Sequence, residues 1–250
     1  MNAENADFKN GTRIGRIRLM DADFSDEIVP LLHTGDRLHR VEFERRYEAM
    51  LHLKKAELIN GIVYVGGSVP ILHAKAQATI VGLCGLYTFH TPGVSPADNA
   101  SLRMGETNEL QPDFSLWIDR PGKGRANVDE DDILTGAPEL IVEVVDNREL
   151  YDLQEKIDVY RVKGVQELIL WRVAEERFDW FWLERDDFQV VTPDEKGVIT
   201  SSAFPGLWLN VKALLAGDLT AVMADLQAGL QSEEHRQFVE WLASDDKPGE

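Results

Sequence analysis

This sequence has little cysteine and few basic residues. Its 250 residues include a single cysteine, Cys84, which excludes a disulfide within the chain and fits a reducing compartment. Apolar neighbours favour a buried structural thiol over a nucleophile at this position. The chain has 26 lysines and arginines against 44 acidic residues, a formal net charge of −18. Such a charge repels phosphate backbones at long range and excludes a non-specific nucleic-acid coat protein.

A long apolar segment and a basic leader are also missing. The least polar run, residues 76–89, is shorter than the roughly 20 residues that a membrane-spanning helix requires. The first seven residues carry two acids where a secretory signal carries basic residues. We therefore expect a cytoplasmic protein that does not enter a membrane.

What the sequence does have is enough apolar material for a core. Hydrophobic residues make up 44% of the chain, as in ordinary globular proteins. The patterns divide the chain into an N-terminal extension (1–38), a main domain (39–215) and a C-terminal helical extension (216–250). No internal repeat is visible.

Hydrophobic periodicity predicts the elements of the main domain. Two β-rich runs flank Asn60-Gly61, which is the strongest short signal for a hairpin. Helical patterns cover residues 40–53, 72–89 and 149–162, and they return from residue 214 onward. Strands are expected at residues 111–119, 140–145, 168–173, 177–183 and 198–208, and a loop at 120–137. This order predicts an α/β fold with a mixed central β-sheet flanked by helices.

The strand at residues 140–145 carries the first candidate for chemistry. Its residues are apolar on both faces, so Glu143 is expected to lie in a central, buried strand. A buried carboxylate needs a metal ion, a lysine or a bound proton. The alternative is that Glu143 lies at the strand end, where it reaches solvent or pairs with a structural arginine.

Two further residues strengthen a functional interpretation of Glu143. Asp113 begins another predicted strand, and two strands that each carry a carboxylate can direct both at one hard cation such as Mg²⁺. Lys156 lies on the helix after Glu143, on the same line as Asp152 and Tyr160. Taken alone, Asp113 fits a turn residue, and Asp152 with Lys156 fits a surface ion pair.

These residues belong to a longer pattern that resembles a known family. In order and spacing, the chain is similar to the Uma-two family of restriction-endonuclease-like bacterial proteins, within the PD-(D/E)XK nuclease superfamily. The resemblance covers about residues 40–215. It rests on ELING (57–61), His73, QPD (111–113), APELIVEVV (137–145), Asp152, Lys156, Tyr160, GVQE (164–167) and FPGL (204–207).

The resemblance implies a restriction-endonuclease-like core and a divalent metal, Mg²⁺ or Mn²⁺, held by Asp113 and Glu143. Glu57 matches an early glutamate of the family and is implied as a further metal ligand. The superfamily lysine, two positions after the acid, is replaced here by Val145, and Lys156 matches the family's relocated lysine on the next helix. Asp113, Glu143 and Lys156 are thus the predicted catalytic residues.

His73, Asp152 and Tyr160 are predicted accessory residues. His73 matches a family position, but a structural histidine that bonds a neighbouring loop is the favoured interpretation, and Tyr160 fits the edge of the core better than a catalyst. The implied reaction is metal-dependent hydrolysis of nucleic-acid phosphodiesters, with DNA favoured, by a homodimer. The competing interpretation is a catalytically silent interaction or regulatory protein on the same fold.

The negative charge is unevenly spread along the chain. Residues 51–100 carry 3 basic and 2 acidic residues, whereas residues 101–250 carry 15 basic and 32 acidic residues. Some of this acid belongs to the predicted metal site, where a bound ion offsets it. We expect either a weak or selective nuclease, or one whose substrate meets the less acidic N-terminal half.

Overall fold

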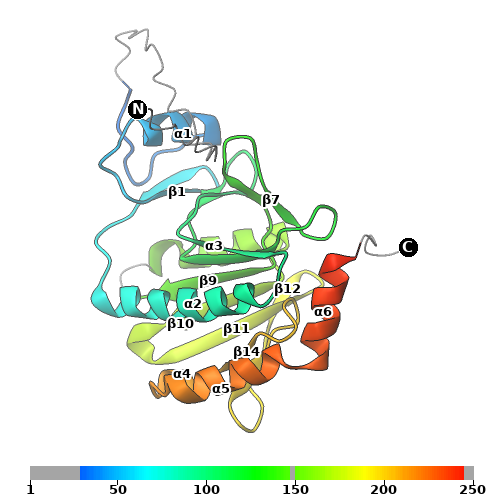
Figure 1. Ribbon diagram of the computed structural model, residues 1–250. Helices are drawn as coiled ribbons and strands as arrows, with labels where there is room; N and C mark the ends of the chain where they lie inside the picture. Colours follow the sequence, from blue (N-terminus) through cyan, green and yellow to red (C-terminus); the bar gives the residue numbers. More distant parts are fainter. Residues whose placement is uncertain (1–28, 147–149, 245–250) are drawn as a thin grey trace, which may run out of the picture.

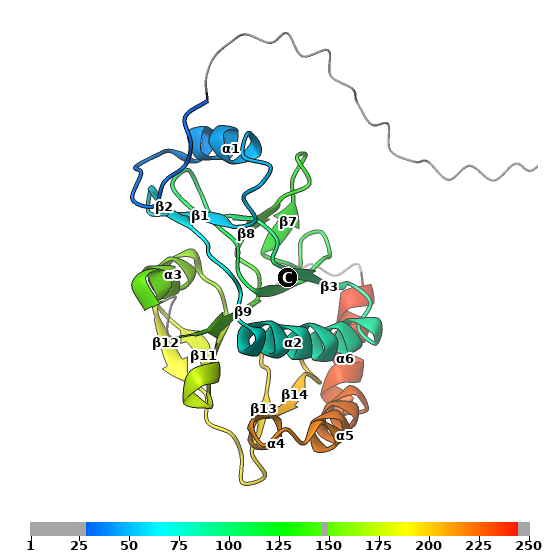
Figure 2. The same cartoon turned by 90° about the vertical axis from the view of Figure 1, so that its left-hand side faces the viewer.

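The computed structural model describes residues 29–146 and 150–244, which form two stacked β-layers with helices packed around them (Figure 1 and Figure 2). Most of the predicted N-terminal extension (1–38) and the last six residues of the C-terminal extension (216–250) lie outside this range. The helices are α1 (Arg40–Glu48), α2 (Ile71–Phe89), α3 (Leu150–Lys163), α4 (Val211–Leu215), α5 (Leu219–Leu230) and α6 (Glu233–Ala243), with a 3₁₀ turn, η1, at Val173–Glu175. None of these described helices is both long enough and apolar enough to cross a membrane.

The strands of the described residues form three sheets. The central sheet has the order β12 (Asp187–Val190), β11 (Arg177–Glu184), β10 (Glu167–Arg172), β9 (Leu140–Val145), β6 (Phe114–Ile118), β3 (Val94–Asp98). A second sheet, here named the hairpin sheet, has the order β2 (Ile62–Val65), β1 (Ala56–Ile59), β5 (Glu109–Leu110), β4 (Leu102–Arg103), β8 (Leu134–Gly136), β7 (Ala126–Val128). The third is a pair, β13 (Val198–Thr200) with β14 (Trp208–Asn210).

The central sheet is mixed, as the sequence predicts. β9 runs parallel to β10 and antiparallel to β6, and α3 connects β9 to β10. Every residue of β9 is buried, because both faces of the sheet are covered. One face packs against α2 and the C-terminal helices through a core that includes Leu83, Tyr87 and Val222. The other face packs against α3 and the hairpin sheet through residues such as Ile59 and Leu153.

The hairpin at Asn60-Gly61 is confirmed. Both residues have positive φ, 51° for Asn60 and 77° for Gly61, as a tight two-residue β-turn requires. The turn sets the register of β1 against β2, in which Glu57 lies opposite Tyr64. This register fixes the face of β1 on which Glu57 lies, and that face lines the cavity described below.

Three local predictions are wrong. The loop expected at 120–137 contains the short β7–β8 hairpin, whose three-residue strands are too brief to show a period of two. Residues 198–208 do not close the central sheet, because a turn at Phe204-Pro205-Gly206, with Gly206 at φ 90°, folds them into the separate β13–β14 pair. The first helix ends at Glu48 rather than continuing to residue 53.

Candidate active site

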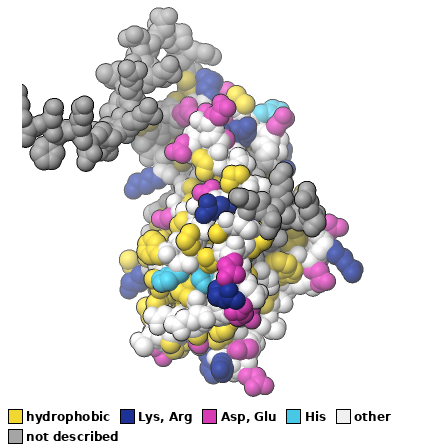
Figure 3. Space-filling view, turned by 45° about the vertical axis from the view of Figure 1, so that its right-hand side comes forward, with side chains coloured by type: hydrophobic (Ala, Val, Ile, Leu, Met, Phe, Trp, Pro, Cys, Tyr) yellow, Lys and Arg dark blue, Asp and Glu magenta, His cyan; other side chains and the backbone are white. Residues whose placement is uncertain are grey.

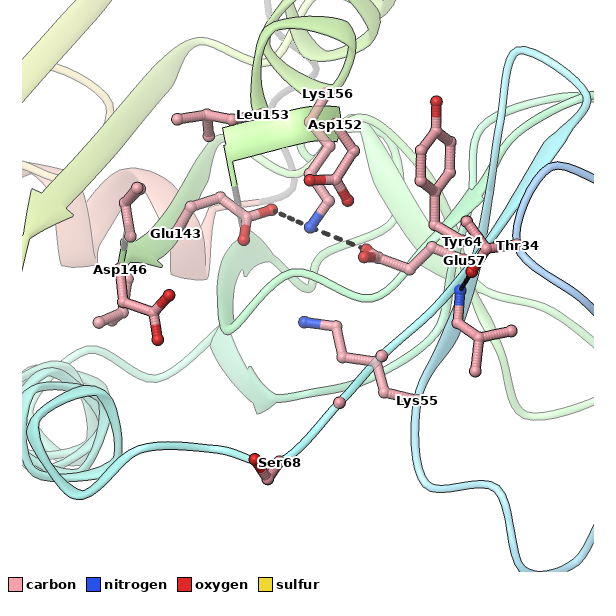
Figure 4. A pocket seen from close by; sticks show the side chains of 15 residues that line it. Thr34, Lys55, Glu57, Tyr64, Ser68, Glu143, Asp146, Asp152, Leu153 and Lys156 are labelled. Carbon is pink, nitrogen blue, oxygen red and sulfur yellow. Dashed lines mark hydrogen bonds and ion pairs between the residues drawn. The ribbon is translucent and has the colours of Figure 1, made fainter. Parts of the chain in front are cut away.

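A cavity of about 580 Å³ opens between the hairpin sheet, the end of β9 and the first turns of α3. The charged side chains that line it are Lys55, Glu57, Glu143, Asp146, Asp152 and Lys156. Figure 4 shows that they come from both β-layers and from α3 and converge on one space. The cavity therefore gathers residues that lie more than a hundred positions apart in sequence.

Asp113, the residue just before β6, lies across from Glu143 of the neighbouring strand β9. The antiparallel register pairs Phe114 with Val142, so the next position along places Asp113 across from Glu143. The Asp113 carboxylate accepts a hydrogen bond from the Val144 backbone N–H at 2.8 Å. The register of the sheet and this hydrogen bond thus hold Asp113 next to β9.

Asp113 is a buried anion with cationic and polar partners. Its Oδ1 lies 3.3 Å from His73 Nε2 and 3.6 Å from Lys55 Nζ. Burial by itself raises the pKa of Asp113, but the hydrogen bond with His73 and the charge of Lys55 outweigh burial, and the pKa lies below its ordinary value. Asp113 is therefore ionised at neutral pH.

Glu143 is buried on the same side of the sheet. Its Oε1 accepts hydrogen bonds from Tyr160 at 2.6 Å and from Lys156 at 3.1 Å. Burial raises the pKa of Glu143 to about 7; the charge of Lys156 opposes this rise and the charge of Asp113 adds to it. The expected alternative, in which Glu143 reaches solvent or an arginine, does not occur.

Lys156 bridges two carboxylates. Its Nζ lies 2.9 Å from Glu57 Oε1 and 3.1 Å from Glu143 Oε1, so it joins the hairpin sheet to the central sheet. Burial alone lowers the pKa of a lysine, but the charges of Glu143 and Glu57 outweigh it and hold the pKa of Lys156 well above its ordinary value. The surface pair of Lys156 with Asp152 is not what forms, because Lys156 is buried. Asp152 lines the same cavity.

A family model described as "Uma2: Putative restriction endonuclease" matches residues 41–212, more than half of the chain. The chain belongs to the Uma2 family. A solved structure titled a "putative nuclease belonging to DUF820", from Anabaena variabilis ATCC 29413, is similar at 16% identity and a TM-score of 0.48. The similarity covers 73% of this chain and 97% of the other. No curated protein matches.

Membership of the Uma2 family confirms the resemblance that the sequence motifs indicated. Together with the mixed sheet and its flanking helices, it confirms the predicted fold class, an α/β protein with a restriction-endonuclease-like core. Of the predicted residues, Glu57, Glu143, Asp152 and Lys156 line the cavity. The others lie behind its wall: Tyr160 donates to Glu143, and Asp113 lies between His73 and Lys55. Their roles in a reaction are taken up below.

The donor chemistry of this Uma2 site suits a hard divalent cation. Carboxylate oxygens are the ligands that Mg²⁺ prefers, and it commonly takes only one or two of them beside several waters. Five carboxylates face two lysines here, which leaves an excess of formal negative charge (Glu57, Asp113, Glu143, Asp146, Asp152; Lys55, Lys156). Across residues 29–146 and 150–244, no group of three or more His, Cys, Asp or Glu side chains is arranged to hold a metal. Asp113 and Glu143 are the two carboxylates that would hold such an ion together with water.

The sequence argument missed Lys55 and Asp146. Lys55 immediately precedes β1 and lies two residues before Glu57, so the alternation of side chains places both on one face of the strand. That spacing was the available signal. Asp146 follows β9 directly and lines the cavity, but nothing in its sequence neighbourhood distinguishes it from a residue in a loop.

Proposed function

We propose that this Uma2 protein is a metal-dependent nuclease that hydrolyses phosphodiester bonds of nucleic acid. The observation that carries the proposal is the placement of Asp113 across from Glu143, beside a cavity that is lined by Glu143 and by two lysines. Membership of a family described as restriction endonucleases supports the choice of reaction. Paired carboxylates beside a lysine are suited to phosphoryl chemistry because they bind a cation while the lysine offsets charge on phosphate oxygens.

In this proposal Asp113 and Glu143 hold Mg²⁺ or Mn²⁺, which when bound lowers the pKa of a water and polarises a phosphoryl oxygen. His73 fixes the Asp113 carboxylate from the first turn of α2. Tyr160 and Lys156 both donate hydrogen bonds to one oxygen of Glu143, and this fixes the orientation of the whole carboxylate. Glu57 keeps the family-implied place near the metal, and its Oε1 is held by the Gln111 backbone N–H at 2.7 Å and by Lys156.

We infer a DNA substrate and a homodimer as the finer part of this proposal. On the face seen in Figure 3, Lys and Arg side chains are scattered among Asp and Glu side chains rather than gathered in one patch. Binding driven by a broad basic surface is therefore not favoured on that face, and contacts at the cavity must supply most of the affinity. Light scattering of the full chain at micromolar concentration measures the oligomeric state.

The proposal is tested by cleavage of single- and double-stranded DNA and RNA in Mg²⁺ or Mn²⁺. Asp113→Asn and Glu143→Gln each remove one anionic ligand while keeping the size of the side chain. We expect each to lower the cleavage rate at least about 100-fold, because the stabilisation of developing charge is lost.

Glu130→Gln is the matched control, since Glu130 is an exposed glutamate on the β7–β8 hairpin loop. It should cleave like the wild type. Cleavage by neither wild type nor control on any of the four substrates would favour the catalytically silent interaction or regulatory protein. Unchanged cleavage by both site variants would show that a contaminating nuclease is responsible.

A further inference from the structure

The two lysines of the site differ in what they contact. Lys156 lies between two carboxylates, at 2.9 and 3.1 Å, and its side chain is 7% exposed. The Lys55 side chain is 23% exposed, and its Nζ lies 3.6 Å from Asp113 Oδ1, beyond the distance of an ordinary hydrogen bond. Figure 4 shows the Lys55 ammonium group pointing into the cavity from the side opposite Lys156. The two ammonium groups therefore have different amounts of hydrogen-bonding capacity left for a ligand.

Lys156 has little left to offer a substrate. Two of its three N–H donors are directed at Glu57 and Glu143, and removing it would leave two buried carboxylates without their cation. Lys55 makes one long ion pair, so its N–H donors can turn toward an anion in the cavity. A lysine with spare donors at the edge of an open cavity is placed to bind a phosphate oxygen.

The backbone holds Lys55 in this position. The Gly66 N–H donates to the Lys55 carbonyl at 2.9 Å and so extends the β1–β2 pairing by one residue. Gly66 also leaves room for the lysine stem, since a Cβ at this position would lie 3.0 Å from Lys55 Cβ. Lys55 therefore extends from backbone that is paired with a strand rather than from a free loop. It also belongs to residues 51–100, which carry 3 basic and 2 acidic residues in a chain of net charge −18.

We propose that Lys55 is the lysine that binds a non-bridging phosphate oxygen of the nucleic-acid backbone, and that Lys156 is a positioning residue that holds Glu57 and Glu143. The assignment rests on the proposed nuclease function. It gives Lys55 the substrate contact that the family pattern implies for Lys156. The ligand class is a phosphodiester, bound at the cavity edge beside Asp113.

The test uses Lys55→Gln, Lys55→Arg and Lys156→Gln, with Lys54→Gln as the matched control, because Lys54 is the adjacent lysine and is exposed. Fluorescence anisotropy with labelled 20-nucleotide DNA and RNA in EDTA and low salt measures binding, cleavage in Mn²⁺ measures kcat and KM, and thermal melting measures folding.

Lys55→Gln should weaken binding about 10-fold and lower kcat/KM about 30-fold while its melting temperature stays within about 2 °C of the wild type. Lys55→Arg should restore binding, and Lys54→Gln should change binding less than about 2-fold. Lys156→Gln should lower the melting temperature by about 10 °C.

Three results overturn the assignment of Lys55. Wild-type binding and cleavage by Lys55→Gln, an equal loss in Lys54→Gln, or a Lys55→Gln melting temperature lowered as far as that of Lys156→Gln would each remove Lys55 from the substrate. If the wild type binds an oligonucleotide in a Lys55-dependent way but cleaves none, the nuclease proposal fails and the phosphate contact stands. If the wild type neither binds nor cleaves, both fail.

Discussion

At the scale of single residues, the site is organised around carboxylates that each have more than one hydrogen-bond partner. One oxygen of Glu143 receives both a phenol and an ammonium donor, while Asp113 receives a backbone N–H and a histidine. Such groups are stable in a buried sheet only when their hydrogen bonds are complete. The consequence is that small changes to a donor should be measurable both as stability and as activity.

Tyr160→Phe tests this arrangement directly, because it removes one hydroxyl and keeps the buried ring. Glu143 loses its 2.6 Å donor, so we expect the free energy of unfolding to fall by about 1–3 kcal/mol. Cleavage should slow about 10-fold, since the carboxylate is held by Lys156 alone. Urea denaturation and single-turnover cleavage measure the two effects, and an unchanged unfolding midpoint would argue that the hydroxyl is dispensable.

A second carboxyl pair, away from the cavity, predicts a pH dependence of stability. Burial, then the hydrogen bond and charge of Glu44, raise the pKa of Glu109 from 4.5 to about 8. The folded state therefore holds this proton more tightly than the unfolded state, and the associated stability is present below pH 4.5 and is lost as the pH rises through about 8.

Glu109→Gln should remove that dependence, because its amide can still donate to Glu44 but does not ionise. We expect the difference in urea midpoint between wild type and variant to change steadily from about pH 5 to about pH 8 and to level off above that, with the variant favoured at the alkaline end. Glu130→Gln serves as the control and should follow the wild type. A constant difference across this range would contradict the raised pKa.

At the scale of elements, the C-terminal helix α6 is fastened to the loop after β6. The Lys123 ammonium group donates to the carbonyl oxygens of Trp241 and Ser244 and lies 4.8 Å from the centre of the Trp241 ring. Phe238 and Leu242 place the same helix in the main core. Residues beyond the family match at 41–212 are thus packed against the core formed by the matched residues.

Lys123→Met should loosen α6 without unfolding the central sheet. The helix loses a cation at its C-terminal carbonyls, so we expect a loss of about 1–2 kcal/mol and faster hydrogen exchange confined to residues 233–243. Lys196→Met, at an exposed turn, is the control. Exchange that speeds up equally in β9 would show that α6 is part of one cooperative unit with the sheet.

The sequence predicted elements well where a pattern ran long and poorly where it was short. The α2 helix follows a long apolar pattern, the β9 strand is an apolar run that only Glu143 interrupts, and Asn60-Gly61 specifies its own turn. The β7–β8 hairpin has three-residue strands, which are too short for a period to be read. Its position is set instead by tertiary contacts such as the Arg103–Asp129 ion pair, which local sequence does not encode.

The candidate site was predictable to the extent that it follows from alternation along strands. Asp113 and Glu143 were found because each begins or interrupts an apolar strand, where a carboxylate is out of place. The Glu57–Lys156 pair joins residues from two layers, and no local pattern specifies which layers stack. Lys55 was missed because a lysine just before a strand usually faces solvent, and only the covering layer makes it half-buried.

At the scale of the whole molecule, the site concentrates negative charge in a chain whose net charge is already −18. A divalent cation bound only by the folded state should therefore raise stability. Mn²⁺ at about 100 times its dissociation constant should add about 2.7 kcal/mol, or about 5–10 °C in melting temperature.

The rise should be absent in the Asp113→Asn, Glu143→Gln double variant and should be reversed by EDTA. A salt control at equal ionic strength separates site binding from general screening. An equal rise in wild type and double variant would place the stabilising ion elsewhere on the surface.

The ion pair between Glu57 and Lys156 has a consequence for how this sequence can change over evolutionary time. Replacing Lys156 alone by an uncharged residue leaves Glu57 and Glu143 buried between two layers without their shared cation, which is more destabilising than most single substitutions. Replacing Glu57 at the same time relieves only one of the two carboxylates, because Glu143 stays. We therefore expect Lys156, 99 residues from Glu57 in the chain, to be substituted only together with both carboxylates.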